Sequence, residues 1–322
     1  MSTPDKTYIR FTDTAKGIPY YVTDSWGIPE FVLHIIETLK NAGFDAYIVG
    51  GAVRNKLLDR PEADWDIATS ATGDEINRIF HNVRHFSLKH QTITLVHEGS
   101  HYEITTIGAY DASERTIKGD LGHRDFTINA MAYDPSGQVI IDPYNGRQDL
   151  GKRILRAVRD PIERFGEDPL RLIRAIRLSA EFGFRIEKNT MEAIISMAPE
   201  LMLAAAERIR DEMMKILLTE RPSLGFKLLR KTGLLGAFLP ELMEGIHKKQ
   251  NSRHRHTVFG HIMETVDRAE QDPVLRLAAL FHDIAKPRVR KKINGDFTFY
   301  IHAEKSAEMA AEIMERLRFS NE

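Results

Sequence analysis

The chain has 322 residues, 42% of them hydrophobic, so we expect two or three domains with cores of their own. Its 45 Lys and Arg against 46 Asp and Glu exclude a chain-wide basic surface, and its lack of cysteine excludes disulfides and thiolate metal sites. The polar segment Met1–Thr14 has no apolar signal core, and no apolar run approaches the ~20 residues of a membrane span. We therefore predict a soluble cytoplasmic protein without a membrane partner.

The first elements predict an α/β head with a mixed sheet and helices over residues 1–141. Apolar residues at helical spacing predict a helix from Ile28 to Asn41, followed by a short buried strand at Ala46–Val49. The glycine pair Gly50-Gly51 then reads as a tight turn that opens a helix. Glycines let backbone N–H groups approach phosphate oxygens, and a helix N-terminus favours anions.

Two aspartates one residue apart, Asp64 and Asp66, stand in a strand predicted over Ala63–Thr69. Alternate side chains share a face, so the two carboxylates lie side by side and Trp65 points to the other face. Carboxylates this close repel unless a cation lies between them, and hard oxygen ligands suit Mg²⁺. With the glycine turn, the pair predicts a nucleoside-triphosphate site that holds two Mg²⁺ ions. The alternative is a solvated turn beside a strand, and sugar-nucleotide transferases also use such a pair.

A helix at Asp74–Phe80 and a hairpin come next, with strands at Gln91–His97 and His101–Ile107 that meet near Gly99. If the second hairpin strand neighbours the aspartate strand, Glu103 supplies a third catalytic carboxylate. Such acids hold metals that align an attacking hydroxyl and stabilise a leaving pyrophosphate. Otherwise Glu103 is an ordinary exposed strand residue.

The segment His123–Ala132 joins Arg124 and Asp125 to an apolar stretch. This pattern predicts Asp125 at the N-cap of a helix, with Arg124 placed to reach a triphosphate or a ribose. A plain capped helix without a ligand is the alternative.

Beyond residue 142, helical periods dominate and strands almost vanish. A polar, basic linker is predicted at 248–255, a short hairpin at Asn294-Gly295, and the amphipathic stretch Ala303–Leu317 indicates that a C-terminal part is missing after Glu322. The earlier helices are expected at Glu167–Phe182, Thr190–Ser196, Ala205–Leu218 and Leu224–Thr232.

The first of these helices carries one polar stripe: Asp168, Arg171, Arg174 and Arg177. Asp168 only accepts hydrogen bonds and Arg171 only donates them, so a rigid helix lets the pair match the edge of a base. Arg174 and Arg177 would clamp phosphates. The alternative is a solvated face with i,i+3 ion pairs.

A second metal site is indicated by residues about twenty apart: His261, His282, Asp283 and His302. Neutral imidazoles and a carboxylate can hold a divalent metal. The segment Leu277–Pro287 resembles the helix of an HD-type metal phosphohydrolase. Such domains usually carry a further downstream aspartate, which is missing after Asp296, so an active and an inactive, structural HD domain both stay open. His254 and His256 are interpreted as linker residues.

Together, these motifs resemble the class II tRNA nucleotidyltransferase family, which comprises CCA-adding enzymes and bacterial poly(A) polymerase. The matching segments follow the family order over roughly residues 45–245: Val49–Arg54, Asp64–Asp66, Arg124–Ala132, Asp142–Gly146 and Glu167–Arg177. The resemblance implies a catalytic head at 1–141, a helical neck and body for nucleobase and RNA binding at 142–247, and a truncated HD-like domain at 248–322.

The resemblance also implies roles for single residues. Asp64 and Asp66 bind Mg²⁺, and the incoming nucleotide is held by the glycine turn (Gly50, Gly51), Arg54 and Arg124. Asp168 and Arg171 read the base of CTP or ATP, with Arg174 and Arg177 beside them. The implied reaction is template-independent addition of C, A or both to the 3′ end of tRNA.

The chain departs from the family at three places: Asn55 replaces a usual Asp, Ile107-Gly108 an aromatic-Arg pair, and His123 an Arg. The loop Gly108–Gly122, which helps the family switch from C to A, is short and atypical. A partial CC- or A-adding activity therefore stays open, as do poly(A) polymerase, a main activity as an HD phosphohydrolase, and an inactive RNA-binding remnant. Basic clusters at Arg147–Arg164 and Lys286–Lys292 are expected to follow an RNA backbone, or to be solvated faces.

Overall fold

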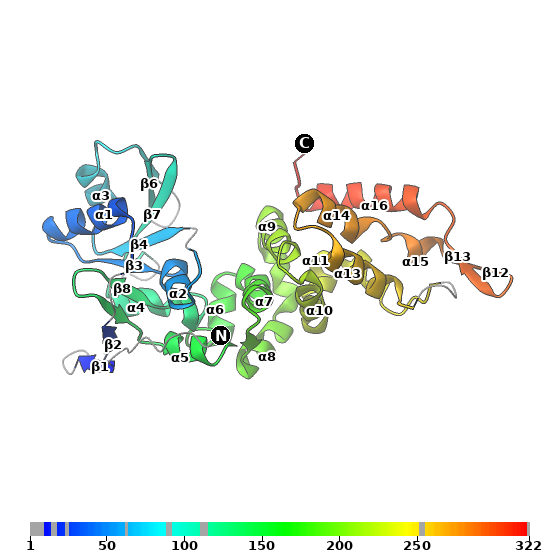
Figure 1. Ribbon diagram of the computed structural model, residues 1–322, viewed down its shortest axis with the longest axis horizontal. Coiled ribbons are helices and arrows are strands. Elements are labelled where there is room, and N and C mark those ends of the chain that lie inside the picture. Colours follow the sequence, from blue (N-terminus) through cyan, green and yellow to red (C-terminus); the bar gives the residue numbers. More distant parts are fainter. Residues whose placement is uncertain are drawn as a thin grey trace. The chain divides into compact units, whose positions relative to one another are not determined.

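The protein is represented by a computed structural model, which describes residues 10–13, 18–22, 26–61, 64–87, 92–109, 115–250 and 255–320, the first two ranges by backbone alone. The chain divides into two compact units, residues 1–160 and 161–322. In Figure 1 the first unit contains the large sheet and the second is built mainly of helices. No helix in the described part of the chain is long and apolar enough to cross a membrane.

A nine-stranded sheet organises the first unit, in the order β1-β2-β9-β8-β3-β4-β7-β6-β5. Only the central pair β4–β7 is parallel, and the other neighbours are antiparallel. The sheet is therefore mixed, as predicted. Its strands are β1 Arg10–Asp13, β2 Ile18–Val22, β3 Ala46–Val49, β4 Trp65–Thr69, β5 His85–Ser87, β6 Thr92–His97, β7 Ser100–Thr106, β8 Ala132–Asp134 and β9 Val139–Ile141; a further short strand is β10 Ile154–Leu155.

Short helices cover this sheet, and α1 shows why they form. Its apolar residues recur every three or four positions and are fully buried, so one helical face packs on β3 and β4. The helix α3 begins with a capping box between Thr72 and Glu75. The helices are α1 Glu30–Asn41, α2 Gly51–Leu57, α3 Gly73–Ile79, α4 Ile117–Gly122, the 3-10 helix η1 Thr127–Asn129 and α5 Gly146–Gly151.

Two local expectations for this unit need correction. The strand β4 begins at Trp65, so Asp64 immediately precedes it. The apolar helix expected after Asp125 does not form: the backbone N–H of Thr127 donates to the carbonyl of Arg156 (2.9 Å), and Phe126 makes a β-bridge with Ala157. These tertiary hydrogen bonds leave only the short η1 before the chain enters β8.

Other expectations here are confirmed. The hairpin of β6 and β7 turns at Glu98 and Gly99, both with positive φ. Ala63, Gln91 and residues 110–114 of the loop Gly108–Gly122 lie outside the described residues.

Helices and a few short strands make up the second unit, as predicted. The helix α7 packs against α9 and α10 and buries Leu172, Ile173 and Ile176. The elements are α6 Pro161–Glu167, α7 Leu170–Phe182, β11 Arg185–Ile186, α8 Lys188–Ser196, η2 Ala198–Leu203, α9 Ala206–Leu217, α10 Pro222–Thr232, α11 Leu234–Phe238, α12 Pro240–Met243, α13 Val258–Arg268, α14 Pro273–Phe281, α15 Lys286–Val289, β12 Lys291–Ile293, β13 Asp296–Thr298 and α16 His302–Arg316.

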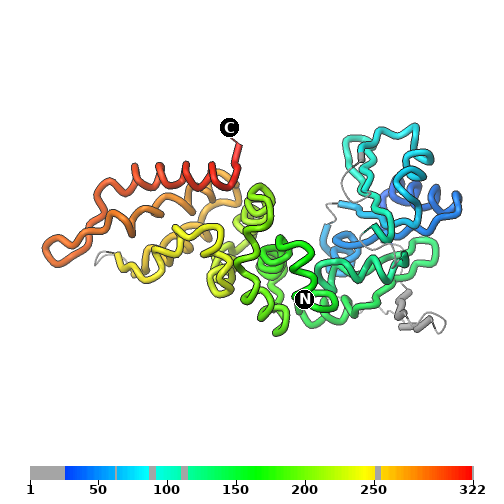
Figure 2. Tube along the Cα trace, turned by 180° about the vertical axis from the view of Figure 1, so that it is seen from behind, coloured from blue at the N-terminus to red at the C-terminus, as the bar shows by residue number. Residues whose placement is uncertain are grey.

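The helix expected over Glu167–Phe182 is interrupted. Pro169 disfavours helical backbone at the residue before it, so α6 ends at Glu167 and α7 begins at Leu170. The predicted hairpin at Asn294-Gly295 forms between β12 and β13. Figure 2 shows this hairpin leading into α16, which packs along α14. The predicted linker is described only at 248–250 and 255, and His254 lies outside the described residues. The predicted boundaries at 141 and 247 stay predictions.

Candidate functional site

The glycine turn after β3 brings Asp66 and Arg124 together. Gly50 has φ of +71°, which L side chains rarely adopt. A Cβ added there would lie 2.7 Å from Nη1 of Arg124 and 3.1 Å from Oδ2 of Asp66. Gly50 therefore allows a close approach that any other residue would block.

The strand register places acidic residues on one face of the sheet. Asp66 pairs with Val49 of β3 and, across the parallel ladder, with Glu103 of β7. Paired residues on neighbouring strands point to the same face, so Asp66 and Glu103 are adjacent. Trp65, one position away, is buried on the other face. The expected neighbourhood of the two strands is confirmed, and the catalytic role of Glu103 stays a prediction.

The charges of this face are coupled. Burial raises the pKa of Asp66; the Arg124 guanidinium opposes this rise, and the Asp64 carboxylate adds to it. Burial also raises the pKa of Glu103, reinforced by the carboxylates of Asp66 and Asp64. Acids whose negative charges are mutually unfavourable are of the residue type that suits a divalent cation.

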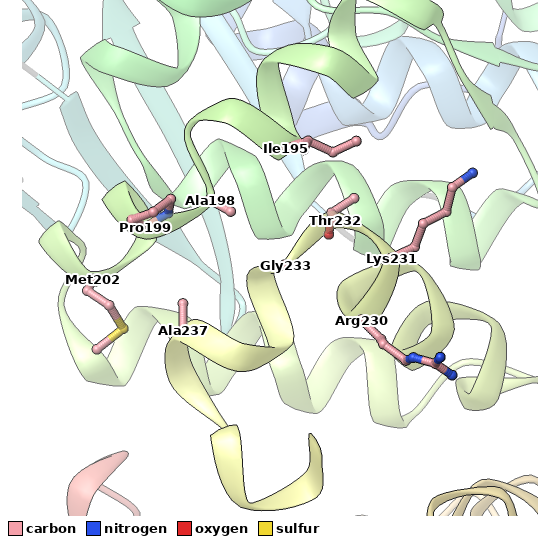
Figure 3. A pocket seen from close by; sticks show the side chains of 9 residues that line it. All are labelled: Ile195, Ala198, Pro199, Met202, Arg230, Lys231, Thr232, Gly233 and Ala237. Atoms are coloured by element: carbon pink, nitrogen blue, oxygen red, sulfur yellow. The ribbon is translucent and has the colours of Figure 1, made fainter. Parts of the chain in front are cut away.

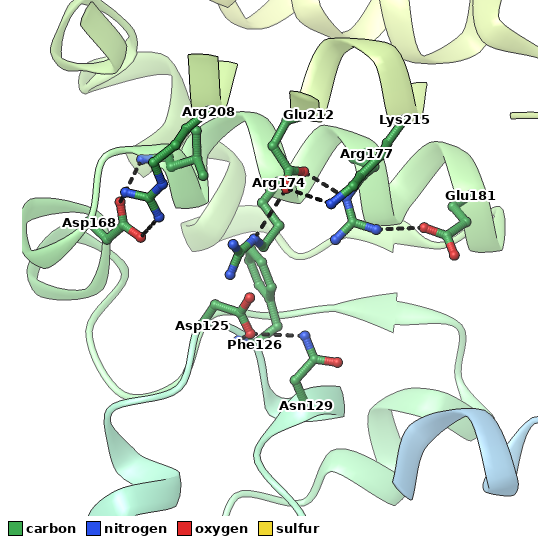
Figure 4. A network of polar contacts seen from close by, with 11 residues as sticks. Asp125, Phe126, Asn129, Asp168, Arg174, Arg177, Glu181, Arg208, Glu212 and Lys215 are labelled. Atoms are coloured by element: carbon green, nitrogen blue, oxygen red, sulfur yellow. Dashed lines mark hydrogen bonds and ion pairs between the residues drawn. The ribbon is translucent and has the colours of Figure 1, made fainter. Parts of the chain in front are cut away.

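Arg54 of α2 is fixed by neighbouring amides. Its Nε and Nη2 donate to Oδ1 of Asn55 (3.1 and 2.9 Å), and its Nη1 donates to Oδ1 of Asn129 (2.5 Å). Nδ2 of Asn129 in turn donates to Oδ1 of Asp125 (2.9 Å), as drawn in Figure 4. Arg54 is 9% exposed, and this network sets the direction of its guanidinium. The sequence pattern did not identify Asn129, because an Asn in an apolar stretch carries no motif by itself.

Asp168 and Arg171 do not pair with each other. Asp168 lies between α6 and α7 and accepts two hydrogen bonds from Arg208 of α9 (3.3 and 2.9 Å). Arg171 donates to Oε2 of Glu167 (3.0 Å) and to the carbonyl of Arg164 (2.9 Å). The two side chains therefore bind separate partners, and their role in reading a base stays a prediction.

The next arginines of the stripe pair with an acid on α9. Glu212, whose side chain is 4% exposed, pairs with Arg177 (2.7 Å) and Arg174 (3.7 Å), and Arg177 also pairs with Glu181 (Figure 4). Their side chains are partly buried, 31% exposed for Arg174 and 16% for Arg177, and the phosphate-clamping role and the alternative of a charged face with ion pairs both stay predictions. The sequence motifs did not include Arg208 and Glu212. The two residues are charged and lie four positions apart, so they share one face of α9.

The histidines and the aspartate of the second predicted metal site converge. Nε2 of His261 lies 3.2 Å from Nε2 of His282, and each is 3.1–3.2 Å from Oδ2 of Asp283. Within the described part of the chain, His261, His282 and Asp283 each offer one ligand atom, and these three atoms all lie within 4.8 Å of one another. His302 lies further out, with Nε2 3.6 Å from Oδ1 of Asp283.

A lysine shares this cluster. Nζ of Lys286 lies 2.6 Å from Oδ2 of Asp283 and donates to Gln250 (2.9 Å). Burial raises the pKa of Asp283, but hydrogen bonds from His282 and Lys286 outweigh burial and lower it to about 2. Asp283 is therefore an anion that already has a cationic partner. No motif in the sequence marks Lys286 as a member of this cluster.

Three family models match the chain. The poly A polymerase head domain matches residues 46–156, the "Probable RNA and SrmB- binding site of polymerase A" matches 183–246, and the HD domain matches 253–322. The first model contains Gly50, Asp66, Glu103 and Arg124, and the last contains the histidine cluster.

Named relatives are CCA-adding enzymes. That of Geobacillus stearothermophilus is 43% identical over 221 residues, which are 65% of this chain and 54% of the relative. That of Leuconostoc mesenteroides is 40% identical over 205 residues, 60% of this chain and 51% of the relative. The chain thus spans about half the length of these relatives.

Solved structures of CCA-adding enzymes also resemble this chain. The Bacillus stearothermophilus CCA-adding enzyme in complex with CTP is 34% identical, with a TM-score of 0.65 over 89% of this chain and 69% of that one. The Thermotoga maritima CCA-adding enzyme complexed with tRNA shares the fold, with 24% identity and a TM-score of 0.68 over 91% of this chain and 68% of that one.

Proposed function

Because this chain belongs to the class II tRNA nucleotidyltransferase family and carries an HD domain, we propose that it adds nucleotides from CTP and ATP to the 3′ end of tRNA without a nucleic-acid template. The observation that carries the proposal is Asp66, which lies between the Gly50 turn, Arg124 and Glu103. A glycine turn beside acids and arginines is the chemistry that a triphosphate needs.

The acidic face fits divalent cations, because the Asp64 carboxylate raises the pKa of Asp66, both aspartates raise the pKa of Glu103, and a cation would relieve this repulsion. We assign Asp64 and Asp66 as ligands of two Mg²⁺ ions, with Glu103 as the third acid. When bound, such ions lower the pKa of an attacking hydroxyl and neutralise a departing pyrophosphate.

The remaining site residues of the head bind and orient the triphosphate. The backbone N–H of Gly51 approaches the phosphates, since neither glycine of the turn has a side chain in the way. Arg54, held by Asn55 and Asn129, and Arg124 supply fixed positive charge for the triphosphate. Fixed donors need no reorganisation when negative charge develops, so they favour the transition state.

Base selection is assigned to Asp168 and Arg171, with Arg174 and Arg177 as their support. Asp168 presents acceptors and Arg171 donors, the two halves of an edge that distinguishes C and A from G and U. Their present partners, Arg208 and Glu167, hold both side chains by ion pairs. To read a base, Asp168 needs a free acceptor and Arg171 a free donor in addition to the ion pairs with Arg208 and Glu167.

The proposal is tested with tRNA that lacks CCA, tRNA that lacks only the final A, and complete tRNA, each with CTP and ATP separately. Addition of CC, of A or of both distinguishes the full activity from the partial ones. A long A tract on any RNA would instead identify a poly(A) polymerase. No extension of any tRNA would refute the proposal. The cytoplasmic location stays a prediction.

A second candidate function is phosphohydrolysis by the HD domain, favoured by the convergence of His261, His282 and Asp283. These side chains fit a divalent cation in type and spacing, although Lys286 shares Asp283 with them. His282→Ala is expected to abolish release of phosphate from nucleotides and RNA ends and to leave nucleotide addition unchanged. Equal phosphate release by the variant would exclude this function.

A further inference from the structure

Two features of the structure lie outside the motifs described so far. One is the cavity drawn in Figure 3, which has a volume of about 600 Å³ and is lined by residues between Ile195 and Ala237. These residues lie within the matched RNA-binding model, so RNA binding already accounts for this cavity. The other is Asp120, an acid of the first unit that belongs to none of the segments that match the family motifs.

Asp120 is a buried acid with one cationic partner. It lies in α4, and its side chain is 3% exposed. Burying a carboxylate costs free energy unless a cation or hydrogen-bond donors compensate its charge. Among the described residues, the one ion pair of Asp120 joins its Oδ2 to Nη2 of Arg124, 3.5 Å away. The partner of this acid is therefore the arginine assigned to the triphosphate.

The helix α4 holds Asp120 over the face of the sheet that carries Asp66. Leu121, the next residue, is fully buried in a hydrophobic cluster that includes Val49 and Ala68. Ala68 follows Asp66 by two residues on β4, so their side chains point to the same face. Val49 is the last residue of β3, next to the glycine turn. The packing of α4 therefore fixes the position of the Asp120 carboxylate relative to the acidic site.

Arg124 lies between two carboxylates. Its Nη1 lies 2.7 Å from the position that a Cβ at Gly50 would occupy, and Oδ2 of Asp66 lies 3.1 Å from the same position. In the part of the chain that the structure describes, no ion pair joins Arg124 to Asp66, whereas Asp120 binds Nη2. Nε of Arg124 has no hydrogen-bond partner there. The ion pair with Asp120 is therefore the contact that orients the guanidinium.

Asp66 is the other acid with which Arg124 interacts. The positive charge of Arg124 lowers the pKa of Asp66, although burial raises it more. A guanidinium that paired with Asp66 would compete with a divalent cation for the same carboxylate oxygens. A carboxylate at Nη2 holds the guanidinium away from Asp66, which leaves the acid available to a cation and Nη1 available to a phosphate.

We propose that Asp120 is a positioning residue of the nucleotidyltransferase site. Its carboxylate orients Arg124 toward the triphosphate and prevents the guanidinium from pairing with Asp66. This inference rests on the proposed function, which assigns the ligands of Arg124 and Asp66. Because Asp120 acts through Arg124 alone, its effect on ligand binding must disappear when Arg124 is removed.

A double-mutant cycle tests this consequence. Asp120→Asn, Arg124→Ala and the double variant are compared with the wild type for binding of CTP in saturating Mg²⁺ and of Mn²⁺ alone, both without tRNA. We expect Asp120→Asn to raise the Kd of CTP roughly tenfold and that of Mn²⁺ about threefold, because the released guanidinium pairs with Asp66. In the Arg124→Ala background, the same substitution should change either Kd by less than about twofold.

Thermal stability supplies a second arm. In the wild-type background, Asp120→Asn removes the counter-charge of Arg124 and is expected to lower Tm. In the Arg124→Ala background, Asp120 is a buried charge without its partner, so the same substitution is expected to raise Tm. The control Asp149→Asn alters an acid that is also 4% exposed but pairs with Arg156 (3.0 Å). It is expected to lower Tm equally in both backgrounds.

Three results would overturn the inference. One is unchanged CTP and Mn²⁺ binding in Asp120→Asn. Another is a loss of binding of the same size with and without Arg124, because Asp120 would then act through the fold or through its own charge. The third is a double variant that does not fold. If the cycle gives the expected results and the wild type extends no tRNA, the role of Asp120 is upheld and the proposed function is refuted.

Discussion

At the scale of single residues, Gly50 illustrates why the site needs this sequence. It combines a positive φ with close contact to the side chains of Arg124 and Asp66. Gly99 also has a positive φ, but nothing lies within 4 Å of a Cβ built there. A substitution at Gly99 therefore adds backbone strain alone, whereas one at Gly50 adds strain and a steric conflict.

We predict that Gly50→Ala destabilises the protein by about 2–4 kcal/mol, the sum of strain and displaced side chains, and lowers nucleotide addition at least about a hundredfold. Gly99→Ala is expected to cost only the strain, about 1–2 kcal/mol, and to keep its activity. Urea denaturation and initial rates measure both effects. Equal activity losses in the two variants would contradict the role of the close approach.

Asn129 orients Arg54 through one oxygen and binds Asp125 through its nitrogen. We predict that Asn129→Ala raises KM for CTP and ATP about tenfold with a smaller change in kcat, because the arginine that binds triphosphate loses one acceptor. Asn129→Asp is expected to be worse, since a carboxylate would face Asp125. Steady-state kinetics on both variants test this, and a better enzyme in Asn129→Asp than in Asn129→Ala would refute it.

Glu103 predicts a pH effect. Its pKa is raised in the folded protein by burial and by Asp66 and Asp64, so the folded state binds its proton more tightly than the unfolded chain does. Its favourable contribution to stability is present below the unfolded pKa and is lost as pH rises through the folded pKa. Glu103→Gln is therefore expected to raise Tm at neutral pH in EDTA, and the gain should vanish in acid below the usual carboxyl range. A Tm gain that is independent of pH would exclude this cause.

At the scale of elements, the α7–α9 contact depends on a buried acid. Glu212 is almost fully buried between Arg174 and Arg177. We predict that Glu212→Gln lowers the free energy of unfolding by about 2–3 kcal/mol, because two partly buried arginines lose their counter-charge. The control Glu181→Gln, at the more exposed end of the same network, should cost less than about 1 kcal/mol. Chemical denaturation distinguishes the two, and equal costs would contradict the account.

The elements also show what the sequence could reveal. The helix α1 and the hairpin of β6 and β7 were predictable because burial imposes periods of 3.6 and 2 on their residues. The replacement of a helix by η1 was not, because distant hydrogen bonds to Arg156 and Ala157 decide it. The break at Pro169 could have been predicted from proline stereochemistry alone.

At the scale of the whole molecule, the sequence reveals the residues of a chemical motif more readily than the residues that hydrogen-bond to them. The motif around Gly50 and Asp66 was identifiable because consecutive residues carry it, and the placement of Glu103 depended on strands β4 and β7 being neighbours, which the structure confirms. The acceptor Asn129 and the counter-ion Glu212 come from segments distant in sequence from the arginines that they bind. Their roles follow from distances that only the fold sets.

The most direct test of the acidic site measures single-turnover incorporation of labelled nucleotide into tRNA that lacks CCA. Wild type, Asp66→Asn and the control Glu37→Gln, which alters an exposed acid on α1, are compared with Mg²⁺ and with EDTA. We predict Mg²⁺-dependent incorporation by the wild type and the control, and a loss of at least about a thousandfold in Asp66→Asn. Incorporation by Asp66→Asn at the rate of the wild type would contradict the account.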